Sequence, residues 1–200
     1  MRNASIFASF VFAAVVAGSA GAANPGTAAP DFTINDAAGK PVKLSDHKGR
    51  YVVLEWTNPE CPFVQKHYNS GNMQGLQKDS AGRDVVWLTV NSTRRSHSEF
   101  KSGDQMAQWV REHAAAPNAV LIDETSATGR AYGARTTPQM FVVDPVGKII
   151  YAGAIDDKRS TNVADVKTAK NYVRTALAEA MAGKPVSEAS TRPYGCSVKY

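Results

Sequence analysis

Residues 51–68, YVVLEWTNPECPFVQKHY, decide the fold of this chain. The apolar run at residues 51–54 is typical of a strand buried on both faces, and a turn-forming Asn-Pro pair ends it. Cys61 comes next and is followed directly by Pro62, a residue type favoured at the first position of a helix. The stretch therefore predicts a strand, a turn and then Cys61 at the N-terminus of a helix.

A thiol at this position is expected to be reactive. The free N–H groups and the positive end of the helix dipole stabilise a thiolate, which attacks electrophilic sulfur or a peroxide oxygen. The alternative is a buried, inert cysteine that packs as a small apolar side chain. Lys66 and His67 would add positive charge if they face the thiol, but a solvated helix face explains them equally well. Glu60, next to Cys61, opposes a thiolate unless its side chain points away.

Length and composition indicate a single globular domain. The chain has 200 residues, of which 43% are hydrophobic and 20% charged, as in soluble folded proteins. The formal net charge is +5, but the basic residues are scattered along the chain. We therefore interpret the charge as a solvated surface and expect no nucleic-acid partner.

The first residues are typical of a signal peptide, residues 1–23. Arg2 supplies a positive start, residues 6–16 an apolar core, and residues 20–22 an A-x-A cleavage pattern. The apolar core is shorter than the roughly 20 residues that a membrane anchor needs. We expect cleavage near Ala23, no membrane association afterwards, and a secreted protein of the bacterial periplasm.

The rest of the chain alternates strands and helices. A linker is expected at residues 24–30, and the fold class is α/β, with a central mixed β-sheet flanked by helices over residues 31–183. A C-terminal tail at residues 184–200 carries the second cysteine. The expected elements are an N-terminal hairpin at 31–44, strands at 51–56, 84–90, 119–122, 140–143 and 148–152, and helices at 62–76, about 106–113, 123–132 (helix or turn) and 162–182.

Two features resemble the thioredoxin-like superfamily: a cysteine after a buried strand, and Thr137-Pro138 just before a later strand. The resemblance implies a thioredoxin-like fold in which Pro138 is cis and faces Cys61. Residues 29–56 look like the opening of the peroxiredoxin and redoxin (AhpC-TSA type) families, and residues 141–157 like their closing hairpin. The motifs CPFV-x-KHY and PYGCSVKY, at the two cysteines, are similar to those of a peroxiredoxin-like group in this superfamily.

The chain departs from these families near the thiol. Val64 stands where thioredoxins have the second cysteine of CxxC, so dithiol exchange within that motif is impossible. Peroxiredoxins have a threonine three residues before the reactive cysteine; here that residue is Asn58, and Thr57 lies one position further back. Arg135 is the candidate for the arginine that peroxiredoxins place near the thiolate.

Together with the signal peptide, the resemblance implies an exported, thiol-dependent redox enzyme with antioxidant, peroxidase-like activity. Cys61 is the expected attacking thiolate and Cys196 the possible resolving thiol, with a peroxide or disulfide as substrate and a thiol reductase as partner. The chain lacks the GxGxxG and CxxCH motifs, and we expect no cofactor and no metal. Cys196 pairs within one chain or between chains, so a monomer and a homodimer both fit.

Three alternatives remain open from the residues. The protein is a thiol-disulfide oxidoreductase that acts on proteins, or it is a non-catalytic module with a structural Cys61–Cys196 disulfide. Such a disulfide would contribute about 4–5 kcal/mol in the chain-entropy model. The third alternative is a metal-binding or chaperone-like module that uses Cys61 and His67, which would lie on different faces of the helix.

Overall fold

The computed structural model describes residues 23–200, so the predicted signal peptide lies outside the described residues except for its last position. The strands are β1 (Thr33–Asn35), β2 (Pro41–Lys43), β3 (Val52–Trp56), β4 (Val86–Asn91), β5 (Ala119–Ile122), β6 (Thr136–Thr137), β7 (Gln139–Val143), β8 (Ile149–Gly153) and β9 (Cys196–Ser197). The helices are α1 (Pro62–Asn69), α2 (Asn72–Ala81), α3 (Gly103–Glu112), α4 (Ala127–Tyr132) and α5 (Tyr172–Met181), with 3-10 turns at Leu44–His47 and Val163–Thr168.

The predicted mixed sheet is confirmed. Its strand order is β5-β4-β3-β7-β8, in which β3, β4 and β5 run parallel while β7 pairs antiparallel with both β3 and β8. Cys61 follows β3, the central strand. Two further pairs, β1 with β2 and β6 with β9, lie outside this sheet.

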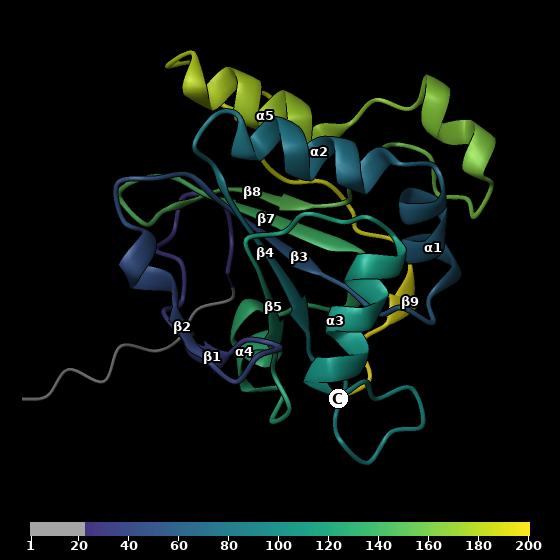
Figure 1. Ribbon diagram of the computed structural model, residues 1–200. Coiled ribbons are helices and arrows are strands. Elements are labelled where there is room, and N and C mark those ends of the chain that lie inside the picture. The colour runs from purple at the N-terminus through teal and green to yellow at the C-terminus, as the bar shows by residue number, and fades with distance from the viewer. Residues whose placement is uncertain (1–22) are drawn as a thin grey trace, which may run out of the picture.

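An apolar core covers each face of the sheet, and Figure 1 shows the sheet with helices α2 and α5 packed over it. Side chains alternate along β3, so Val53 packs under α1, α2, α3 and α5 while Leu54 and Trp56 pack against the β1–β2 hairpin and α4. This two-sided burial is why β3 is apolar along nearly its whole length. Among residues 23–200, no helix combines the length and the apolarity needed to cross a bilayer.

Two predicted helices differ from the structure. The helix expected at 62–76 is broken at Gly71, whose φ of 73° is left-handed, as the glycines near its end predict, but a second helix, α2, continues beyond the predicted end. The helix expected at 162–182 is wrong in its first half, which is a 3-10 turn with Val163 41% exposed. The helix begins later because the side chain of Asn171 accepts a hydrogen bond from the backbone N–H of Arg174 and so caps α5.

Candidate functional site

Cys61 lies where residues 51–68 predict it. It is the N-cap residue of α1, with Pro62 in the first turn, and its backbone N–H donates to the carbonyl of Asn58 (3.0 Å) in the turn after β3. Its side chain is only 1% exposed. The position of this thiol is therefore fixed by β3 and the turn before it and by α1 after it.

The loop before β7 brings Pro138 to the site. The Thr137-Pro138 peptide bond is cis, as the resemblance implies, and the carbonyl oxygen of Thr137 lies 3.0 Å from Cys61 Sγ. The cis bond turns the chain between β6 and β7, so this carbonyl faces the N-terminus of α1.

The C-terminal tail brings the second thiol to the first. Strand β9 pairs antiparallel with β6, with Cys196 opposite Thr137, and the two cysteine Sγ atoms are 2.7 Å apart. Gly195 permits this approach, because a Cβ at that position would lie 1.9 Å from the carbonyl oxygen of Thr137. Its φ of +140° also favours glycine. Figure 1 shows β9 beside the start of α1.

The two thiols are not equivalent. Burial raises the pKa of Cys196 to about 12, and the hydrogen bond and the charge of Cys61 act in the same direction. The Cys196 thiol therefore keeps its proton at neutral pH.

The turn residues Thr57 and Asn58 are both buried. The side chain of Asn58 accepts from the backbone N–H of Glu60 (2.9 Å) and donates to Glu99 (2.6 Å), which fixes the turn before the thiol. The hydroxyl of Thr57 has no hydrogen-bond partner within residues 23–200, and neither has that of Thr137. The turn before Cys61 and strand β6 therefore each carry a buried hydroxyl group that is free to donate.

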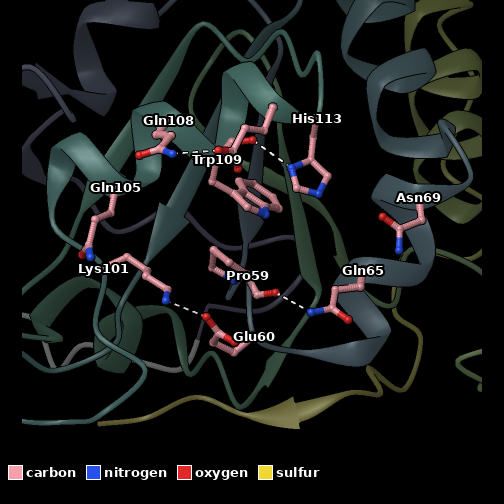
Figure 2. Close-up of a pocket in the computed structure, with 10 residues that line it drawn as sticks. Pro59, Glu60, Gln65, Asn69, Lys101, Gln105, Gln108, Trp109 and His113 are labelled. Atoms are coloured by element: carbon pink, nitrogen blue, oxygen red, sulfur yellow. Dashed lines mark hydrogen bonds and ion pairs between the residues drawn. The ribbon is translucent and has the colours of Figure 1, made fainter.

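Glu60, the residue before Cys61, forms an ion pair with a lysine. Its carboxylate pairs with Lys101 (2.6 Å) and lines a polar cavity of about 490 Å³. Figure 2 shows this pair, and Gln65 donating to the carbonyl of Pro59 beside it. The carboxylate of Glu60 is therefore directed toward Lys101.

Arg135 is not brought to the thiol by any contact within the described part of the chain. Its side chain is exposed and lines a different cavity, together with Arg130 and Arg192. Only its backbone takes part in the site region, where its carbonyl accepts from the N–H of Val198 in the tail.

Lys66 and His67 are fully buried, so the interpretation as a solvated helix face is wrong. They contact Asp156 and Tyr194, two residues for which the sequence predicts no role. Burial and the charge of Lys66 lower the pKa of His67 to about 3, so the imidazole adds no positive charge at neutral pH. The signal for this cluster is the pair of motifs CPFV-x-KHY and PYGCSVKY, which supply Lys66, His67 and Tyr194.

Glu55 is a second buried group without a sequence prediction. It accepts hydrogen bonds from Tyr68 (2.8 Å), Trp87 (2.8 Å) and Thr89 (3.1 Å), and burial raises its pKa despite these donors. The sequence feature that could have revealed this group is a single carboxylate inside an otherwise apolar strand.

No group of three or more His, Cys, Asp or Glu side chains within residues 23–200 is arranged to hold a metal ion. The two ring nitrogens of His67 contact Asn72 and Tyr194 rather than Cys61. The pairing of Cys61 with His67 at a metal is therefore not the arrangement that the fold builds.

Comparison with known proteins gives the family. The crystal structure of an uncharacterized conserved protein from Geobacillus kaustophilus superposes with a TM-score of 0.77 at 28% identity, over 89% of this chain and 93% of that one. Thiol-disulfide oxidoreductase ResA of Bacillus subtilis is 26% identical over 126 residues, which are 62% of this chain and 64% of ResA. Peroxiredoxin Q, chloroplastic, of Oryza sativa subsp. japonica is 29% identical over 139 residues, 66% of this chain and 59% of that protein.

The chain thus spans less than two thirds of the length of these two named relatives. The family match itself extends over most of the described domain, from residue 25 to residue 152, and includes β3, Cys61 and Pro138. Together with the thioredoxin-like arrangement of the sheet, it shows that the chain belongs to the AhpC/TSA family.

Proposed function

We propose that the protein is a two-cysteine, thiol-dependent peroxidase in which Cys61 attacks the peroxide and Cys196 resolves the product. The observation that carries this proposal is the 2.7 Å separation of the two Sγ atoms, at the N-terminus of α1. In the reduced protein the second thiol already stands where a disulfide would form.

The reaction has two chemical steps. The Cys61 thiolate attacks one oxygen of the peroxide, the O–O bond breaks, and after protonation the products are a sulfenic acid at Cys61 and an alcohol or water. The sulfur of Cys196 then displaces the hydroxyl group, which leaves as water with the Cys196 proton, and the Cys61–Cys196 disulfide forms. A dithiol reductase restores both thiols and becomes a disulfide itself.

Two features favour a small oxidant. The free hydroxyl groups of Thr57 and Thr137 offer hydrogen-bond donors for a peroxide oxygen. Strand β9 occupies the edge of β6 beside Cys61, so a polypeptide substrate would have to displace it. A protein disulfide is the second candidate substrate, favoured by the similarity to ResA, and Val64 then makes Cys196 the partner thiol.

The setting of the reaction is part of the same proposal. Residues 1–23 direct the chain out of the cytosol, into the bacterial periplasm, where a disulfide persists between turnovers. The pairing of β9 with β6 within one chain favours an intramolecular disulfide over one between chains. Non-reducing electrophoresis of the oxidised protein separates this from a disulfide-linked dimer.

The test is rapid mixing of the fully reduced protein with hydrogen peroxide, monitored by tryptophan fluorescence and by mass spectra of the products. We expect fast oxidation that ends in the Cys61–Cys196 disulfide. Cys61→Ser should abolish it, and Cys196→Ser should stop at sulfenic and then sulfinic acid. Oxidation of Cys61 no faster than that of a free thiol would refute the peroxidase.

A parallel series with oxidised glutathione and a disulfide-containing peptide tests the second candidate. A rate with these disulfides above that with peroxide would assign the protein to thiol-disulfide exchange. A structural bridge predicts a third result, in which the disulfide resists reduction by a dithiol and no oxidant reacts quickly with the reduced protein.

A further inference from the structure

Four buried polar side chains that the two-cysteine chemistry does not use lie together beneath the tail. Lys66 and His67 come from α1, Asp156 follows β8, and Tyr194 lies two residues before Cys196. Each is at most 8% exposed. We call these four residues the tail latch, because Tyr194 is the member that belongs to the tail.

Hydrogen bonds join the members in a fixed order. The amide of Asn72 donates to Nδ1 of His67 (2.9 Å), which leaves the imidazole proton on Nε2, 3.3 Å from the hydroxyl oxygen of Tyr194. The Tyr194 hydroxyl in turn donates to Asp156. Tyr194 thus accepts from a neutral histidine and donates to a carboxylate, which satisfies both functions of its hydroxyl group.

The other carboxylate oxygen of Asp156 faces Lys66 Nζ (3.4 Å), which also donates to the carbonyl of Lys158 (2.6 Å). The ring of Phe63 packs edge-to-face on Tyr194, with 5.7 Å between centroids. A buried charge pair is tolerated only when further hydrogen bonds complete it, and Tyr194 provides one of them. Removal of the Tyr194 hydroxyl therefore weakens the docking of the tail specifically.

The docked tail also closes the site. Cys61 is 1% exposed, with Cys196 Sγ at 2.7 Å and the Thr137 carbonyl at 3.0 Å from its sulfur. An oxidant has to form a bond to Cys61 Sγ, so the tail has to lift before the first step. It then has to return for the second step, because the disulfide needs Cys196 in contact with Cys61.

We propose that Tyr194, held by Asp156 and His67, is a positioning residue that sets the balance between a docked tail, which covers Cys61 and places Cys196, and a lifted tail, which opens Cys61 to the oxidant. Its place in a catalytic cycle rests on the proposed peroxidase function. The covering of Cys61 by the latched tail does not, and it can be measured without peroxide.

The test is the rate at which iodoacetamide alkylates Cys61 in the full chain carrying Cys196→Ser, with and without Tyr194→Phe. Loss of a hydrogen bond to a charged group should raise the fraction of lifted tail, and with it the alkylation rate, about tenfold. Tyr132→Phe is the matched control. It deletes the hydroxyl of another buried tyrosine, which donates to the carbonyl of Pro30, and should leave the rate unchanged.

An unchanged rate in Tyr194→Phe, or an equal increase in Tyr132→Phe, would overturn the latch, because the second result is what general destabilisation produces. Gly195→Ala offers an independent route: it lifts the tail by collision with Thr137 and leaves the latch residues intact. Alkylation that does not rise in Gly195→Ala would equally overturn the proposal. Failure of the peroxidase itself appears separately, as slow oxidation of Cys61 by peroxide in the unmodified protein.

Discussion

The two cysteines are held in opposite ways. Cys61 lies between the central strand β3 and helix α1, inside the larger apolar core, where neighbouring residues in the sequence fix its position. Cys196 lies on a two-residue strand in a tail, and its position depends on contacts with residues far away in the sequence. Cys61 is thus part of the domain core, whereas Cys196 reaches the site only when the tail is docked.

This difference supports the roles proposed for the two cysteines. A nucleophile needs a fixed environment, and the β3–turn–α1 unit provides one at Cys61. A resolving thiol needs to approach and withdraw, and a short strand with few hydrogen bonds suits this movement. The tail latch joins helix α1, which holds Cys61, to the tail that carries Cys196. Variants in the latch and in strand β9 therefore distinguish effects on the domain from effects on the tail.

The largest effect is expected from Lys66→Met. This change leaves Asp156 buried without its cation, and breaking a buried ion pair costs about 3–5 kcal/mol in the free energy of unfolding. The double variant with Asp156→Leu should recover much of this loss, because no unpaired charge then remains. Urea unfolding of the reduced unmodified protein, the single variant and the double variant measures these differences.

The control is an ion pair on the surface. Arg95 and Glu124 are 3.4 Å apart but well exposed, so Arg95→Ala should change the free energy of unfolding by less than about 1 kcal/mol. If Lys66→Met lost as little as Arg95→Ala, the buried pair would not support the domain beneath the tail.

Gly195→Ala should disturb the position of Cys196 and leave that of Cys61 unchanged. The new Cβ would meet the carbonyl of Thr137, and the strain of its φ of +140° adds about 1–3 kcal/mol against docking. We expect disulfide formation after oxidation by peroxide to slow at least about tenfold. Sulfinic acid at Cys61 should then accumulate, as mass spectra would show.

Gly147→Ala is the matched control for Gly195→Ala. Gly147 also has a left-handed φ, of +88°, but nothing lies within 4 Å of a Cβ there. It should lose a similar amount of local backbone stability and keep the disulfide rate of the unmodified protein. A normal disulfide rate in Gly195→Ala would show that the close approach to Thr137 is not needed.

Local sequence signals made the surroundings of Cys61 predictable. The apolar run, the Asn-Pro turn and Pro62 predict β3, the turn and the start of α1, and the resemblance supplied the cis bond at Pro138. The mixed sheet followed from short apolar runs separated by turn formers. In each case the residues that form the feature are neighbours, or the family motif spans them.

The tail and the buried polar residues beneath it were not predictable in the same way. Lys66 and His67 look like a solvated helix face because their burial depends on partners 90 residues away at Asp156 and 127 residues away at Tyr194. The late start of α5 has a local cause, the cap at Asn171, which apolar periodicity does not reveal. Polar contacts over long sequence separations leave no periodic pattern to read.

The smallest effect is a dependence of stability on pH at His67. Its pKa is about 3 in the folded protein against 6.5 for the unfolded group, so the unfolded state binds a proton first as the pH falls. The stability contributed by the neutral imidazole is therefore present above about pH 6.5 and is lost progressively below it. From about pH 7 to about pH 5.5 the loss is about 1 kcal/mol.

Glu55 acts in the opposite sense, because its raised pKa makes the folded state hold its proton longer as the pH rises. The unmodified protein alone therefore shows only the sum of the two groups. His67→Gln keeps an amide N–H in reach of Tyr194 but cannot titrate, so the difference between the two proteins isolates His67. Urea unfolding at both pH values should show the unmodified protein losing about 1 kcal/mol relative to His67→Gln. Parallel curves would mean that the tail latch admits water, and the docked tail would then be a looser cover over Cys61 than its burial indicates.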